Sequence, residues 1–259
     1  MSKLFEELDY RETPLGELFL RRRRHIGLDA DIYEIKLGED FLMSSLFTSS
    51  ELALGRLGIA RARDNRRARP DEPRVEPKLD VVVGGLGLGY TAAAVLESEA
   101  TGSLCVVEYL EPVIEWHRQG LLPTSSNLIQ DARCSFLQGD FFALSSSTEG
   151  FDPVQPGRRF DAILVDIDHT PDQWLNPSNE SFYHPDGLRR VKSHLNSGGV
   201  FGLWSNEPAD AEFTQRLAAI FGAAYAEPVV FHNPLQNREF TQSVYIATAE
   251  ANDGLPYPE

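Results

Sequence analysis

The stretch that most constrains how this chain can fold runs from Leu79 to Thr91 and reads LDVVVGGLGLGYT. Its apolar first half, Leu79 to Val83, is typical of a parallel strand that is covered on both faces. A glycine-rich turn follows at once, and then the small residues of a predicted helix; the glycines are Gly84, Gly85, Gly87 and Gly89. A strand, a glycine turn and a helix N-terminus can bring backbone N–H groups up to a nucleotide-like ligand. The alternative is a glycine turn that binds nothing.

Strands and helices alternate after this turn. The predicted strands are Leu79–Gly85, Leu104–Tyr109, Cys134–Gln138, Phe160–Ile167, Val200–Trp204, Val229–His232 and Ser243–Thr248. The predicted helices are Thr91–Glu99, Pro112–Arg118, Pro185–Asn196 and Ala209–Phe221. This order predicts an α/β fold with a doubly wound, mostly parallel seven-stranded sheet. No helix separates the last two strands, so the final strand should be antiparallel, at or near an edge.

The segment before the glycine turn has a different pattern. Residues 15–47 alternate as strands do and predict a small antiparallel sheet, and Ser49–Leu57 predicts a short helix. Residues 61–78 hold three prolines and few apolar residues, which favours a linker or exposed loop. We therefore divide the chain into an N-terminal β-domain (1–60), a linker (61–78), a ligand-binding α/β domain (79–250) and a tail (251–259).

The charge of the chain is strongly negative and unevenly distributed. The 259 residues carry a net charge of −15, and residues 81–259 hold nine Lys and Arg against 23 Asp and Glu. Such a surface repels nucleic acid and favours cationic small molecules, although a merely solvated acidic surface is the simpler interpretation. No apolar run is long enough to cross a membrane, and Cys105 and Cys134 lie in apolar runs as free thiols would. We expect a cytoplasmic protein that binds neither nucleic acid nor membranes.

Two acidic residues end neighbouring predicted strands. Glu108 lies about 20 residues beyond the glycine turn, where a carboxylate can accept hydrogen bonds from ribose hydroxyls. Asp140 ends the next strand, where it could meet an adenine amino group or simply cap a helix. Both nicotinamide-dinucleotide enzymes and adenosyl-sulfonium enzymes use such acids, so the two residues predict a nucleoside site without separating these classes.

A third group of polar residues follows the buried strand Phe160–Ile167. Asp166, Asp168 and His169 would line the crevice at the carboxyl ends of the strands, where a carboxylate or imidazole could orient or deprotonate an amine. The spacing of the two aspartates offers no third metal ligand, so no metal is predicted. Tyr183 could close over a ligand or pack beneath the loop.

In this order the pieces resemble the class I adenosylmethionine-dependent methyltransferase fold, and more closely the spermidine synthase (polyamine aminopropyltransferase) family. VVVGGLGLGYT, VVEYLEPVIEW, QGDFF and FDAILVDID are similar to that family's glycine, ribose, adenine and catalytic-loop segments. The likeness spans about Asp31 to Thr248 and is strongest to a divergent bacterial subgroup with a similar LMSS and SSELALGRLG. It implies a homodimeric transferase whose co-substrate is S-adenosylmethionine or its decarboxylated form. It also implies nucleoside binding at the glycines, Glu108 and Asp140.

The sequence departs from the family where the chemistry takes place. The family's glycine motif usually carries an aspartate where this chain has Gly87 and Leu88, and the polyamine pocket here offers Ser49, Ser50 and Glu51. The family's catalytic loop has two aspartates three apart; here Asp166 is followed by His169, with Asp168 as a substitute. Three hypotheses follow: aminopropyl transfer to a small amine, methyl transfer to a small molecule, or nucleoside binding without catalysis.

Overall fold

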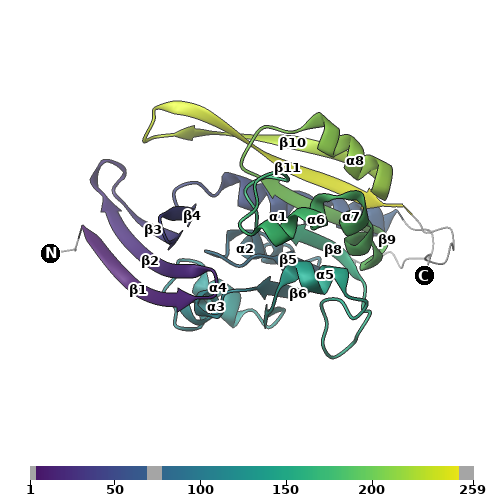
Figure 1. The fold of residues 1–259 in the computed structure, drawn as a ribbon, viewed down its shortest axis with the longest axis horizontal. Helices are drawn as coiled ribbons and strands as arrows, with labels where there is room; N and C mark the ends of the chain where they lie inside the picture. The colour runs from purple at the N-terminus through teal and green to yellow at the C-terminus, as the bar shows by residue number, and fades with distance from the viewer. Residues whose placement is uncertain (1–3, 69–77, 251–259) are drawn as a thin grey trace.

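The computed structural model describes residues 4–68 and 78–250, which form two sheets that lie next to each other (Figure 1). The N-terminal sheet is small and antiparallel, and the larger sheet holds seven strands. Both were predicted, and the fold class is confirmed. No helix in the described ranges is both long and apolar enough to cross a membrane.

The seven-stranded sheet has the order β10-β11-β9-β8-β5-β6-β7. Its strands are β5 (Leu79–Gly84), β6 (Thr101–Glu108), β7 (Cys134–Gln138), β8 (Phe160–Val165), β9 (Leu195–Ser205), β10 (Gly222–Asn233) and β11 (Arg238–Ala249). The strands β5 to β9 are parallel, and β11 is antiparallel to both of its neighbours. β8 is buried along its whole length and β5 along almost all of it, which explains their apolar sequences. The last strand is therefore antiparallel and second from the edge, as predicted.

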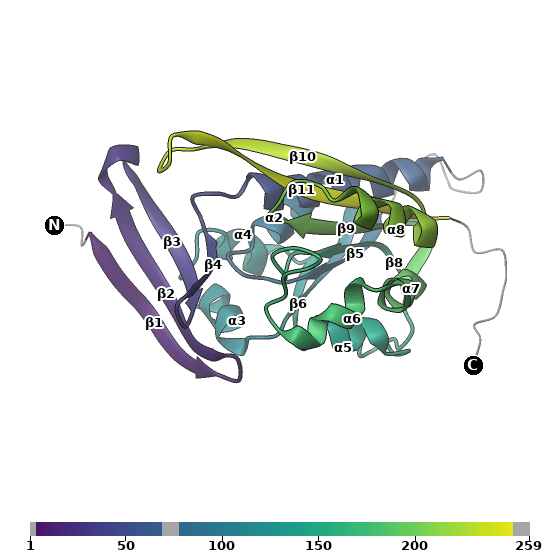
Figure 2. The same ribbon diagram turned by 45° about the horizontal axis from the view of Figure 1, so that its top comes forward.

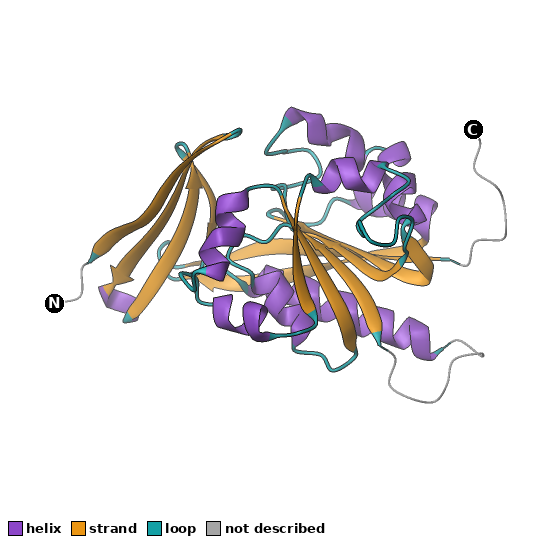
Figure 3. Cartoon of the chain, turned by 90° about the horizontal axis from the view of Figure 1, so that it is seen from below, coloured by secondary structure: helices purple, strands orange, loops and turns teal. Residues whose placement is uncertain are grey.

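Helices cover both faces of this sheet (Figure 3). One face packs against α1 (Ser49–Arg67), α2 (Tyr90–Leu96), α3 (Glu111–Arg118) and α4 (Ser125–Gln130). The other packs against α5 (Phe141–Ser146), α6 (Glu180–Tyr183), α7 (Pro185–Ser193) and α8 (Ala211–Phe221). Each face of the sheet packs into its own hydrophobic core. Alternate residues of β5 belong to different cores: Val81 and Val83 lie in one and Val82 in the other.

The N-terminal sheet consists of β1 (Phe5–Thr13), β2 (Gly16–His25), β3 (Ala30–Leu37) and β4 (Asp40–Ser44) in sequence order, with a 3-10 turn at Ile26–Leu28. β1 was not predicted, because it is a largely polar edge strand with no buried residue. Trp116 of α3 donates its indole N–H to Asp9 of β1 over 2.7 Å, which ties the small sheet to the large one.

The helix predicted at Ser49–Leu57 continues to Arg67, so the prediction of a loop from residue 61 is wrong for residues 61–67. Arginine and alanine are good helix formers, and tertiary contacts add to this preference. Ala62 is buried, and Arg66 forms a 2.6 Å ion pair with Asp161 of β8. The rest of the predicted linker, at 69–77, and the tail at 251–259 lie outside the described residues.

The β10–β11 hairpin is longer than the predicted strands, and its turn reaches toward the N-terminal sheet (Figures 1 and 2). In β11 the prediction covers Ser243–Thr248, the part that pairs with β9. In β10 it covers Val229–His232, next to the turn, and omits the first part of the strand, from Gly222 to Pro228, which has no buried residue.

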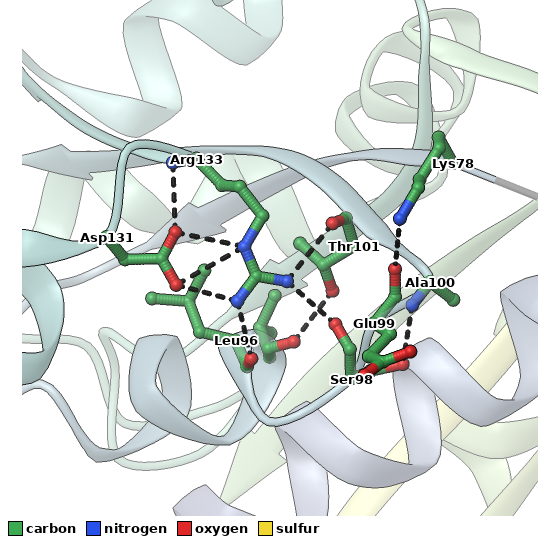
Figure 4. A network of polar contacts seen from close by, with 9 residues as sticks. Lys78, Leu96, Ser98, Glu99, Ala100, Thr101, Asp131 and Arg133 are labelled. Atoms are coloured by element: carbon green, nitrogen blue, oxygen red, sulfur yellow. Dashed lines mark hydrogen bonds and ion pairs between the residues drawn. The ribbon is translucent and has the colours of Figure 1, made fainter.

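Arg133 lies at the end of the sheet where the strands begin, and its side chain forms hydrogen bonds with the neighbouring chain segments there (Figure 4). Its guanidinium donates to the carbonyls of Leu96 at 2.8 Å, Ser98 at 2.9 Å and Thr101 at 3.2 Å, and it also pairs with Asp131. The carbonyls at a helix C-terminus have no partner within the helix, and Arg133 supplies one for the end of α2. The open side of the sheet is the opposite one, at the carboxyl ends of the strands.

Candidate functional site

A cavity of about 720 Å³ lies at the carboxyl ends of the parallel strands. The loops after β5, β6, β7 and β8 form one side of it. The N-terminal sheet, the start of α1 and the turn of the β10–β11 hairpin form the other. Open α/β sheets bind ligands at this edge.

The glycine turn presents bare backbone to this cavity. Gly85 and Gly87 line it with φ angles of +92° and +46°. A Cβ on Gly85 would overlap the carbonyl oxygen of Asp166, and one on Gly87 would overlap the sulfur of Met43. Gly84 and Gly89 are not in the lining of the cavity; Gly84 packs on Phe141, and Gly89 is the N-cap of α2.

Glu108 holds the glycine turn in place. One of its carboxylate oxygens accepts from the backbone N–H of Leu86 at 3.0 Å and the other from that of Leu110 at 2.8 Å. The side chain lines the cavity, and burial raises its pKa. Each oxygen can accept a second hydrogen bond, so Glu108 can still serve a ligand.

Asp140 is a helix cap, one of the two roles that its sequence position allowed, and it also lines the cavity. Its Oδ1 accepts from the backbone N–H groups of Phe142 at 2.8 Å and Ala143 at 3.2 Å, so it is the N-cap of α5. The residue is also exposed and lines the cavity.

The central feature of the cavity is a pair of carboxyl groups: Glu51, which is buried in the first turn of α1, and Asp166, which is half-buried after β8. Thr91 donates to Asp166 over 2.6 Å, and Ser50 donates to Glu51 over 2.8 Å. Burial, together with the nearby charge of Asp166, raises the pKa of Glu51 to about 8. Burial raises the pKa of Asp166 to about 6. The pair therefore retains a proton near neutral pH, and a cation placed beside it would favour full ionisation.

Residues that sequence reasoning missed support Glu51. The indole N–H of Trp204 donates to Ser50 over 2.8 Å, and Ser50 lies 2.6 Å from the amide oxygen of Gln242. Gln242 in turn donates to Asn206 over 2.7 Å. Trp204 and Asn206 are at the carboxyl end of β9. The expectation that ligand-binding residues follow the carboxyl ends of parallel strands could have identified them. No sequence pattern indicates Gln242.

His117, also missed, supports the glycine turn. The carbonyl oxygen of Gly87 accepts from its Nε2 over 2.9 Å, and burial lowers the pKa of this imidazole to about 4. The imidazole therefore acts as a neutral hydrogen-bond donor.

Asp168 corrects an expectation, because it is not among the described residues that line the cavity. Its carboxylate accepts from the N–H of Leu175 at 2.7 Å, the amide of Asn179 at 3.0 Å and the hydroxyl of Tyr183 at 2.8 Å. With 1% of its surface exposed, it holds the loop after β8 together. Tyr183 is buried beneath that loop, His169 lines the cavity, and Ser49 is exposed at the start of α1.

The lining of the cavity has an excess of acidic groups. Among the described residues that line it are five carboxyl groups, Glu34, Glu51, Glu108, Asp140 and Asp166, and one arginine. That arginine, Arg23, is 2.7 Å from Glu34 and pairs with it. The described part of the chain contains no cluster of three or more His, Cys, Asp or Glu side chains placed to hold a metal ion. The electrostatics of the cavity favour a cationic ligand.

The comparisons with known proteins concern the fold. A spermidine synthase crystallised with the transition-state analogue AdoDATO matches over 94% of this chain and 74% of its own, with a TM-score of 0.65 and 15% identity. The spermidine synthase of Thermotoga maritima matches over 94% and 72%, with a TM-score of 0.64 and 14% identity. This chain has a spermidine synthase-like fold. No protein-family model and no curated protein matched the sequence.

The carboxyl pair should make the stability of this spermidine synthase-like fold depend on pH. The pKa of Glu51 is higher in the folded chain than in the unfolded one, so the folded chain binds more protons between the two values. The contribution of Glu51 to stability is therefore fully present below its unfolded pKa and is lost as the pH rises through its folded pKa. Between about pH 5 and about pH 8, we expect the unfolding free energy to fall on the order of 2 kcal/mol further than in Glu51→Gln.

Urea unfolding at both pH values measures this difference. The matched control is Glu227→Gln, which changes an exposed side chain on β10 and should keep the wild-type pH dependence. Parallel pH profiles for wild type and Glu51→Gln would contradict the assignment.

Proposed function

We propose that this protein is a transferase that binds decarboxylated S-adenosylmethionine and moves its aminopropyl group to a small amine. The observation that carries the proposal is the pair of Glu51 and Asp166 beside the glycine turn, in a cavity rich in carboxyl groups. The likeness to spermidine synthases over most of the chain supports it.

In this proposal the nucleoside lies along the glycine turn. The bare backbone at Gly85 and Gly87 allows close approach of the ligand. Glu108 would accept hydrogen bonds from the ribose hydroxyls, and Asp140 would accept one from the adenine amino group. The sulfonium would then lie toward Asp166, whose backbone contacts Gly85.

The reaction is an in-line displacement, and the residues here supply position and a base. The amine nitrogen forms a bond to the carbon attached to sulfur, the carbon–sulfur bond breaks, and its electron pair stays on sulfur as a neutral thioether. The acceptor would enter as an ammonium ion held by Glu51, since its positive charge relieves the repulsion within the pair. Asp166 would accept one proton from it before the nitrogen attacks, because an ammonium nitrogen has no free electron pair, and the product leaves as a secondary ammonium ion.

The charge distribution favours aminopropyl transfer over methyl transfer. A methyl donor brings a carboxylate into the site, and the arginine that lines the described cavity is already paired with Glu34. The decarboxylated co-substrate keeps the ammonium group, which the acidic lining stabilises, and lacks the carboxylate.

Calorimetry with both forms of adenosylmethionine tests this proposal. We expect the decarboxylated form to bind at least about tenfold more tightly, which corresponds to about 1.4 kcal/mol. Methylthioadenosine, which lacks the amine, measures nucleoside binding alone. Preference for the carboxylated form would support the methyltransferase hypothesis, and tight binding without transfer to any amine would support the non-catalytic one.

A further inference from the structure

The part of the cavity that faces the N-terminal sheet is largely apolar. Six side chains from β3, β4, the loop after β4 and the turn of the β10–β11 hairpin line it: Leu37, Phe41, Leu42, Leu46, Phe47 and Leu235. Phe41 and Leu235 are 57% and 48% exposed, so a ligand that covers them would remove apolar surface from water. Phe47 also packs against Phe231 of β10, with the ring centroids 5.6 Å apart, which joins the loop after β4 to the hairpin.

The same region holds little to bind a second ammonium group. Among the described residues, Glu34 is the carboxylate that the N-terminal sheet contributes to the lining, and Arg23 already neutralises it. Ser44 accepts from the backbone N–H of Leu46, and Gln242 is occupied by Ser50 and Asn206. Gln236, next to Leu235, also lines the cavity, but its amide is neutral and carries no charge to offset an ammonium group. A linear diamine would place its distant charge against apolar side chains, which is costly for an unpaired charge.

We propose that the acceptor is a monoamine with an apolar aliphatic or aromatic body. Its nitrogen lies beside Glu51 and Asp166, and its body lies against Leu37, Phe41 and Leu235. The inference rests on the proposed function for the reaction at the nitrogen. The binding of the apolar body follows from the cavity itself and does not require turnover.

Matched amines test this inference on the full chain. Hexylamine and 1,4-diaminobutane are each titrated into the protein by calorimetry, with and without methylthioadenosine. Each is then incubated with decarboxylated adenosylmethionine, and the products are measured by mass spectrometry. We expect hexylamine to bind roughly tenfold more tightly than the diamine and to be the better acceptor. Equal or tighter binding of the diamine would overturn the inference. Failure of the proposed function would look different: hexylamine would still bind preferentially, but no aminopropyl product would form.

A pair of phenylalanine variants locates the apolar body. Phe41→Ala removes a ring that lines the cavity, and Phe5→Ala removes a ring of similar exposure, 54%, outside the cavity lining. Phe41→Ala should weaken hexylamine binding roughly fivefold and leave diamine binding unchanged, whereas Phe5→Ala should change neither. An unchanged affinity for hexylamine in Phe41→Ala, or an equal loss for both amines, would contradict the assignment.

Discussion

Replacing Asp166 with asparagine is expected to lower the rate of aminopropyl transfer by at least about 100-fold, because a positioned general base contributes about 10² to 10⁴ in rate. The amide keeps the shape of the side chain and can still accept from Thr91, which donates to Asp166 over 2.6 Å. It cannot take the proton of the amine. Binding of methylthioadenosine, measured by calorimetry, should stay within about threefold, since the proposed nucleoside contacts lie at the glycine turn and Glu108.

Asp168→Asn is the matched control for this prediction. Asp168 holds the loop after β8 through Leu175, Asn179 and Tyr183, so its replacement should lower the unfolding free energy by about 1–3 kcal/mol. The rate of the molecules that remain folded should change far less than in Asp166→Asn. A transfer rate that Asp166→Asn leaves unchanged would remove the catalytic assignment, and a selective rate loss in Asp168→Asn would move it to that residue.

Replacing Gly85 with alanine is expected to cost about 2–4 kcal/mol of stability and to abolish nucleoside binding. Two effects combine at this position: a φ of +92° strains any side chain, and the new Cβ would overlap the carbonyl oxygen of Asp166. The turn cannot relax easily, because two backbone hydrogen bonds hold it. The N–H of Gly85 donates to the carbonyl oxygen of Val107 over 2.9 Å, and the N–H of Asp166 donates to the carbonyl oxygen of Gly84 over 2.8 Å. Urea unfolding and methylthioadenosine calorimetry measure the two losses.

Gly120→Ala separates the two effects. Gly120 has a φ of +74°, but nothing lies within 4 Å of a Cβ built on it. Its replacement should cost only the conformational strain, about 1 kcal/mol, and leave nucleoside binding intact. If Gly85→Ala cost no more than Gly120→Ala, the close packing of the glycine turn on Asp166 would be refuted.

Local sequence patterns determined the architecture of this protein. The apolar run before Gly84 and the alternation after it indicated the parallel sheet, because buried parallel strands require continuous apolar residues. The order of the last two strands indicated the antiparallel edge. The same patterns failed where local signals are weak. β1 is a polar edge strand with no buried face, and α1 extends through an arginine-rich segment that tertiary contacts hold in place.

The composition of the site was only partly readable from the sequence. Acids at strand ends were expected near the ligand, and Glu108, Asp140 and Asp166 do line one cavity. Asp168, two residues further on, faces away from it, since the direction of a loop side chain depends on its partners and not on spacing.

What the tertiary structure alone decided is the carboxyl pair and the apolar half of the cavity. The hydroxyl of Ser50, which supports Glu51, forms a hydrogen bond with the amide oxygen of Gln242, 192 residues away in the sequence. The hydroxyl of Thr91 donates a hydrogen bond to the carboxylate of Asp166, 75 residues away. The pKa of a carboxyl group depends on burial and neighbouring charge, which exist only once such distant segments pack together. The sequence by itself determined where a nucleoside could lie. The tertiary structure decides which second molecule can fit beside the nucleoside, because the N-terminal sheet and the β10–β11 hairpin pack next to the glycine turn. The side chains of these two elements set the shape and polarity of that part of the cavity.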